Sequence, residues 1–292
     1  MNLFNIISEL EKVDPEIMDR LTHRRSALTA LGDMTKKMAL AAAPIAIGSA
    51  FNKAMGQNNS NATVNDILNY ALLLERLEYS FYNQALNAAT LSTTLTGDAR
   101  TAITTIRAHE LAHVNLLTAA LGSNVSPATA PTFDFGANAF TTYAGFLTLA
   151  QAFEDTGVRA YKGQATSIPR TLNPTVGGNQ VNLLTVALQI HSVEARHAAH
   201  IRYMRRGATA GAQTSIMPWI VNKDANGVPD AVYGAGVPTT TFPAEDNVAQ
   251  GGITALTTML GATYSAADVS AAFDEGLDST TVTNIARSVV KF

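Results

Sequence analysis

Apolar residues recur at helical spacing (i, i+3, i+4 and i+7) from about residue 63 onward and predict four long helices. The predicted helices cover residues 64–86, 98–121, 139–164 and 181–206. Asp98 is expected near the N-terminus of the second helix, and Asn138 is expected as the N-cap of the third. Gly122 and Gly207 are expected to end the second and the fourth helix. The pattern therefore predicts an all-α protein built on a four-helix bundle.

The four helices repeat one helix pair twice. Glu75 is followed seven residues later by Tyr82 in the first helix, and Glu154 stands at the same distance from Tyr161 in the third. The second and fourth helices share the pattern I-x-x-x-E-x-x-H, which occurs as Ile106, Glu110 and His113 and again as Ile190, Glu194 and His197. The stretch 122–138 is long enough, at roughly 50 Å when extended, to run the length of a bundle as one long crossover.

The repeated pattern predicts a two-metal site inside the bundle. Residues three apart share a helix face, so each Glu-x-x-His pair directs a carboxylate and an imidazole to one point. Two such pairs, each preceded by a helix with an inward Glu, match the ligand pattern of two-metal carboxylate bundles. The predicted ligands, which would also carry the catalysis through the metals, are Glu75, Glu110, His113, Glu154, Glu194 and His197. Four carboxylates balance two divalent ions, and without metal they would repel one another.

Some assignments within the helices have alternatives. Glu78 lies one turn beyond Glu75 and is an alternative inward carboxylate, but only Glu75 repeats the seven-residue spacing to a tyrosine. Tyr82 and Tyr161 are candidates to donate a hydrogen bond to a ligand carboxylate, or to fill the core as aromatic residues. Three further histidines are expected to be polar or surface residues rather than ligands: His109, His191 and His200.

The motifs LLLERLEYSFY, HELAH, FEDTGVRAY and VEARH, in this order, resemble the ferritin-like superfamily over roughly residues 60–206. They are most similar to bacterial ferritin-like domain proteins related to plant desiccation-related proteins. The resemblance implies the same six ligands, two iron or manganese ions, and reaction with dioxygen or peroxide. One feature departs from the pattern, because bacterioferritins commonly place an acidic residue before each Glu-x-x-His, where this chain has His109 and Val193.

Composition narrows the function further. The chain has no cysteine, which excludes disulfides, thiolate catalysis and iron–sulfur ligation, so metal ligands must be Asp, Glu or His. The net charge of −3 and the lack of a basic stripe argue against nucleic acid as a partner. Long segments on both sides of the bundle argue against a ferritin storage cage, whereas a homo-oligomer stays open. Di-metal reaction with dioxygen or peroxide is the leading hypothesis, with a structural, stress-protective envelope protein as the alternative.

Three regions are expected along the chain: a leader over 1–56, the bundle over 57–206 and a C-terminal extension over 207–292. The leader contains two adjacent arginines before the uncharged run 38–51, which is too short to span a bilayer and resembles a twin-arginine export signal. Export to the periplasm or cell envelope is expected, or a cytoplasmic location if the leader is retained. The extension is expected to pack on the bundle and to end in two or three short helices over 245–292.

Overall fold

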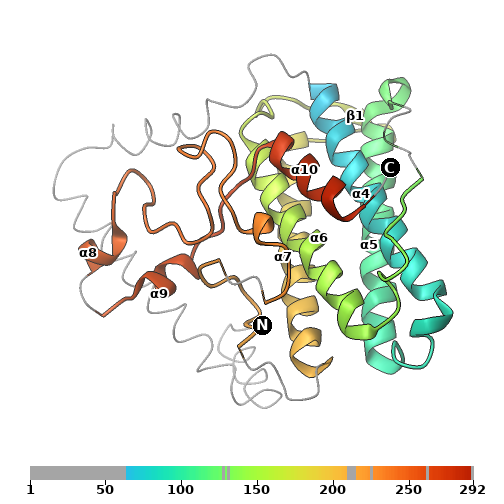
Figure 1. Ribbon diagram of the computed structural model, residues 1–292. Coiled ribbons are helices and arrows are strands. Elements are labelled where there is room, and N and C mark those ends of the chain that lie inside the picture. The colour runs from blue at the N-terminus through green and yellow to red at the C-terminus, as the bar shows by residue number, and fades with distance from the viewer. Residues whose placement is uncertain are drawn as a thin grey trace, which may run out of the picture.

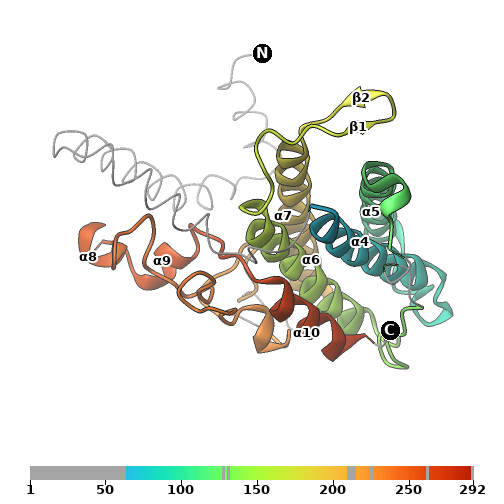
Figure 2. The ribbon, with the colours of Figure 1, turned by 90° about the horizontal axis from the view of Figure 1, so that it is seen from above.

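The computed structural model describes residues 64–126, 129, 132–208, 215–223, 226–260 and 263–290, so the predicted leader lies outside the described residues. Its long helices are α4 (Val64–Asn87), α5 (Gly97–Leu121), α6 (Tyr143–Ala165) and α7 (Leu183–Ala208). Figures 1 and 2 show the four helices side by side, with α4 packed along α5 and α6 packed along α7. The predicted helical bundle is therefore confirmed.

Two of the predicted helix ends are wrong. The N-cap of α6 is Thr142, whose side chain accepts a hydrogen bond from the backbone N–H of Gly145, because Asn138 lies in a separate turn before the helix. Gly207 does not end α7, which continues to Ala208. Gly122 does cap α5 and has a φ of 55°, in the left-handed region that favours glycine.

The segment between α5 and α6 runs along the outside of α4. It begins with the 3₁₀ turn η2 (Gly122–Asn124). Four side-chain hydrogen bonds attach it to α4 and to the turn η1 (Ala89–Leu91) after it: Asn69 to Asn124, Arg76 to Thr129, Gln84 to Phe133 and Thr90 to Phe140. Because the order of these contacts follows α4 from one end to the other, this segment is the predicted long crossover.

A small β-hairpin joins α6 to α7. It pairs β1 (Thr175–Val176) with β2 (Asn179–Gln180) in antiparallel fashion, and Figure 2 shows it projecting away from the four helices. Among the helices that the structure describes, none has the length and apolar character needed to cross a bilayer.

Two apolar clusters fill the bundle interior, one toward each end. The first includes Phe81, Ile103, Phe146 and Ile201, and the second includes Leu72, Leu117, Leu183 and Ile190. On each long helix the predicted metal ligands fall between the residues of the first cluster and those of the second. The ligands therefore form a polar layer in the middle of the bundle, with apolar side chains above and below.

The described part of the C-terminal extension packs on α6 and α4. Its described part contains η4 (Asp230–Val232), α8 (Leu256–Leu260), α9 (Ala266–Ser270) and α10 (Ser279–Val289). A third apolar cluster joins Leu74, Ala152 and Ala160 of the bundle to Ile220, Tyr233, Leu277 and Ile285 of the extension. Figure 1 shows α10 against α6, with α8 and α9 farther from the bundle.

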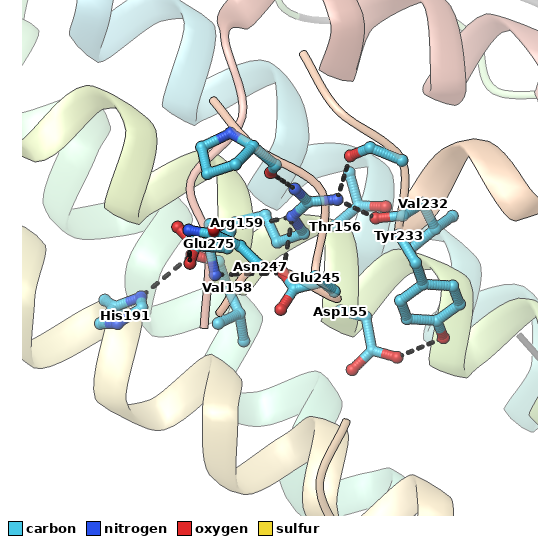
Figure 3. Close-up of polar contacts among 12 residues, drawn as sticks. Asp155, Thr156, Val158, Arg159, His191, Val232, Tyr233, Glu245, Asn247 and Glu275 are labelled. Carbon is cyan, nitrogen blue, oxygen red and sulfur yellow. Dashed lines mark hydrogen bonds and ion pairs between the residues drawn. The ribbon is translucent and has the colours of Figure 1, made fainter. Parts of the chain in front are cut away.

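Arg159 of α6 fastens the extension to the bundle (Figure 3). Its guanidinium is fully buried and lies 2.8 Å from the carboxylate of Glu245. The same guanidinium donates hydrogen bonds of 2.6–3.1 Å to the backbone carbonyls of Val232, Gly234, Pro243 and Glu275. One side chain therefore satisfies four carbonyls from three separate loops of the extension.

A second buried network lies beside it. The Arg202 guanidinium donates to the Asp155 carboxylate at 2.6 Å, and the Tyr233 hydroxyl donates to the same carboxylate at 2.7 Å. Gln151 donates to the Tyr233 hydroxyl at 2.8 Å. The two networks join α6 and α7 to the extension through buried charges, which are expensive to bury unless they are paired.

Gly163 lets the extension approach α6 closely. A Cβ atom added there would lie 1.9 Å from the backbone oxygen of Leu277, and the facing residue is also a glycine, Gly276. We expect Gly163→Ala to lower the free energy of unfolding by about 1–3 kcal/mol, because the backbone of the extension must move away. Gly207→Ala is the control, because a Cβ atom added there meets open space. This substitution should leave the free energy of unfolding unchanged or raise it slightly. Equal midpoints for the two variants in denaturant would contradict this account of Gly163.

Candidate metal centre

The structure brings the six residues predicted as ligands together in the polar layer of the bundle. Glu75 comes from α4, and Glu154 comes from α6. Glu110 and His113 lie one turn apart on α5, and Glu194 and His197 repeat the arrangement on α7. The four carboxylate side chains are fully buried, whereas the side chains of His113 and His197 are 12% and 5% exposed.

The six residues divide into two overlapping groups of four. In each group one ligand atom per residue lies within 4.8 Å of all the others. The first group is Glu75, Glu110, His113 and Glu194, and the second is Glu110, Glu154, Glu194 and His197. Glu110 and Glu194 belong to both groups, whereas Glu75, His113, Glu154 and His197 each belong to one.

Each histidine directs its Nδ1 atom at three carboxylates. The Nδ1 of His113 lies 3.0 Å from Glu75, 3.2 Å from Glu110 and 3.2 Å from Glu194. The corresponding distances from the Nδ1 of His197 are 2.9 Å to Glu110, 3.3 Å to Glu154 and 3.5 Å to Glu194. The two halves of the sequence repeat thus produce two nearly equivalent sets of contacts.

Several of these atoms point at a shared centre rather than at one another. Within the described residues, five buried atoms of the layer have no hydrogen-bond partner: Glu110 Oε1, Glu154 Oε2, both carboxylate oxygens of Glu194, and His197 Nδ1. His197 Nδ1 lies 2.9 Å from Glu110 Oε1 without the alignment of a hydrogen bond. Unsatisfied buried oxygens are costly, and a cation between them would satisfy all of them. Oxygen and imidazole donors suit iron and manganese, so these residues fit such ions.

The two tyrosines hold carboxylates across the bundle. The hydroxyl of Tyr82 donates a short hydrogen bond to Glu154, and the hydroxyl of Tyr161 donates one to Glu75. Each tyrosine thus supports the glutamate of the opposite helix, not the one seven residues before it. This exchange explains why the Glu-to-Tyr spacing occurs in both halves of the repeat.

Glu78, which the sequence analysis gave as an alternative inward carboxylate to Glu75, is also buried in this layer. It belongs to neither group of four. A Cβ atom added at Gly157 would lie 3.1 Å from a Glu78 carboxyl oxygen and 3.7 Å from Glu194, so the glycine leaves the room that the two side chains occupy. Both α4 glutamates therefore face inward, and the i, i+3 spacing that places them on one face was the available signal.

The metal-free site favours protonated carboxyls. Burial raises the pKa values of Glu75, Glu78 and Glu110, and the negative charge of Glu194 raises all three further. Burial also raises the pKa of Glu154 to about 7, although the neighbouring His197 opposes the shift. Burial and mutual repulsion thus favour the protonated form of each of these four carboxyls.

The two histidines show the complementary behaviour. Burial lowers the pKa of His113, but its close contacts with the carboxylates of Glu110, Glu194 and Glu75 outweigh burial and raise it to about 12. The pKa of His197 is also raised, because the charge of Glu154 and the other carboxylates outweighs its burial. Burial opposes ionisation of Glu194, yet contact with both histidines lowers its pKa to about 2. Metal binding must displace the histidine protons, so metal uptake releases protons.

The remaining histidines lie outside the two groups. The Nδ1 of His191 lies 3.0 Å from the backbone carbonyl of Val158 (Figure 3), and the ring of the exposed His200 lies 6.3 Å from that of Tyr203, tilted by 36°. His109 has a different environment, because its Nδ1 lies 2.9 Å from the Nε2 of the predicted ligand His197. His109 is exposed and lies outside both groups, in keeping with the expected polar or surface role, but its contact with His197 was not predicted.

The fold and the polar layer together define a four-helix-bundle protein whose interior can hold metal ions. Residues 63–206 match the family model described as a ferritin-like domain. Residues 63–206 therefore form a ferritin-like domain, as the motifs indicated. Comparison with curated proteins and with solved structures found no match.

Proposed function

We propose that this protein binds two iron or two manganese ions in the polar layer and uses them to react with dioxygen or peroxide. The observation that carries the proposal is the pair of four-residue groups that share Glu110 and Glu194. A single metal site would need only one such group. Protection against oxidative stress is the physiological role that this chemistry suggests.

The residues of the chain would divide the work as follows. Glu110 and Glu194 would bridge the two positions, and Glu75, His113, Glu154 and His197 would each complete one of them. When bound, divalent iron or manganese would supply the electrons that reduce dioxygen or peroxide. Tyr82 and Tyr161 orient the outer carboxylates, and the apolar clusters on both sides keep bulk water from the layer.

Glu78 can hold a proton beside the centre. Its carboxyl is buried, and its pKa is raised by burial and by the four carboxylates predicted as ligands. A neutral carboxylic acid can donate a hydrogen bond or a proton, whereas an ionised carboxylate only accepts. This carboxyl would therefore serve as a local proton source without being a ligand.

The test is turnover by metal-loaded protein. Apo-protein loaded anaerobically with iron(II) should oxidise that iron faster than buffer does when dioxygen or hydrogen peroxide is added. Manganese(II)-loaded protein should be assayed for loss of peroxide and release of dioxygen. The double variant Glu110→Gln/Glu194→Gln, which lacks both shared carboxylates, is expected to show neither activity. A stable wild-type fold with neither activity would instead support the structural, stress-protective role.

A further inference from the structure

The outer edges of the two predicted histidine ligands have different surroundings. His197 turns its Nε2 away from the carboxylates and toward the Nδ1 of His109, at 2.9 Å. The two rings are nearly parallel, with 10° between their planes and 5.2 Å between their centroids. The side chain of His197 is only 5% exposed, whereas His109 lies on the exposed face of α5.

His113 has no such support. No hydrogen bond from its Nε2 to any of the described residues is found, and its side chain is 12% exposed. Val193 borders it in an open hollow that His109 and His197 also line, so His113 and His197 differ in their hydrogen-bond partner rather than in access to this hollow. Val193 precedes Glu194 as His109 precedes Glu110, so the two halves of the repeat differ at this position.

The difference matters for metal binding. A neutral imidazole that binds a metal through Nδ1 carries its proton on Nε2 and needs an acceptor there. Such an acceptor fixes the tautomer and orientation of the ring, and its loss typically weakens metal binding by about 10- to 100-fold. The Nδ1 of a neutral His109 is an acceptor for His197, whereas a valine side chain offers His113 none.

We propose that His109 is a positioning residue that makes the two metal positions unequal. The position formed with His197 binds a divalent ion more tightly and fills first. The position formed with His113, whose Nε2 has no acceptor among the described residues, fills second and releases its ion more readily. This inference rests on the proposed two-metal function, but it concerns the order of filling rather than the reaction.

The experiment is a titration of the full-length apo-protein with manganese(II), with free manganese counted by electron paramagnetic resonance. Wild-type protein should show two steps whose Kd values differ by about tenfold or more. His109→Ala should weaken the tighter step by about 10- to 100-fold and leave the weaker step in place. His109→Asp should restore the tighter step, because a carboxylate accepts the same hydrogen bond. His200→Ala, which changes an exposed histidine on α7, is the matched control.

A second measurement needs only the wild-type chain. In zinc-loaded, ¹⁵N-labelled protein, one metal-bound histidine should keep a slowly exchanging Nε2 proton, and the other should exchange quickly with water. Equal manganese steps in wild-type protein, or equal weakening of both steps by His109→Ala, would overturn the role of His109 while leaving the two-metal function intact. A folded protein that binds no manganese and no iron would instead overturn the proposed function itself.

Discussion

Replacing Arg159 with Met is expected to lower the free energy of unfolding by about 3–5 kcal/mol. The substitution removes the partner of the buried Glu245 carboxylate and leaves four backbone carbonyls of the extension without their donor. Methionine has a similar length, so the loss reflects hydrogen bonds and charge more than empty space. Chemical denaturation followed by circular dichroism measures the change.

Two further variants make this result specific to the anchor. Arg159→Lys keeps a positive charge but cannot reach carbonyls in three loops at once, so it should fall between wild type and Arg159→Met. Arg170→Met removes an exposed arginine and should change stability by no more than about 0.5 kcal/mol. A loss below 1 kcal/mol for Arg159→Met would show that the extension does not depend on this residue.

Metal-free protein is expected to lose stability as the pH rises from about 6.5 to 9, whereas the stabilisation by metal should grow. The pKa of His113 is raised from 6.5 to about 12 in the folded chain, so its contribution is complete below pH 6.5 and declines above it. The buried Glu75 and Glu110, with pKa values raised above 4.5, act in the same direction, and their contribution is lost as the pH rises above about 4.5. Each extra proton held by the folded state changes stability by about 1.4 kcal/mol per pH unit.

Calorimetry at several pH values with and without manganese(II) tests this linkage. Metal at a hundredfold excess over Kd should add about 2.7 kcal/mol for each site, and the apparent Kd should fall as the pH rises because fewer protons compete. Glu78→Gln should make the stability of the metal-free protein depend less steeply on pH, because it removes a buried carboxyl whose pKa is raised. Glu78 is not one of the predicted ligands, so metal binding should be retained. A metal-free melting temperature that rises between pH 6.5 and 9 would refute the proton-loaded apo site.

The bundle and the grouping of the six residues could be predicted because both depend on the spacing of residues along single helices. Apolar spacing marks the helices, and the repeated Glu-x-x-His places a carboxylate and an imidazole on one face of α5 and again on α7. The exchange of Tyr82 and Tyr161 between opposite helices could not be predicted, because it depends on how the two hairpins face each other.

Contacts between distant segments escaped prediction for the same reason. Nothing near Arg159 in the sequence indicates that it pairs with Glu245 or reaches carbonyls of the extension, and FEDTGVRAY reads equally well as an ordinary helix. The error at Asn138 was one of choice between two good capping residues, since Thr142 lies four positions later and its hydroxyl reaches Gly145. The contact between His109 and His197 could not be predicted, because the two residues lie on different helices.

Metal content tests the central claim most directly. Wild-type protein purified without chelator, incubated anaerobically with iron(II) or with manganese(II) and then desalted, should retain about two ions per chain by elemental analysis. Glu110→Gln/Glu194→Gln should retain none while staying folded, because both shared carboxylates are gone. Wild-type protein that is folded, yet retains neither metal and gains no thermal stability from either, would contradict the two-metal account.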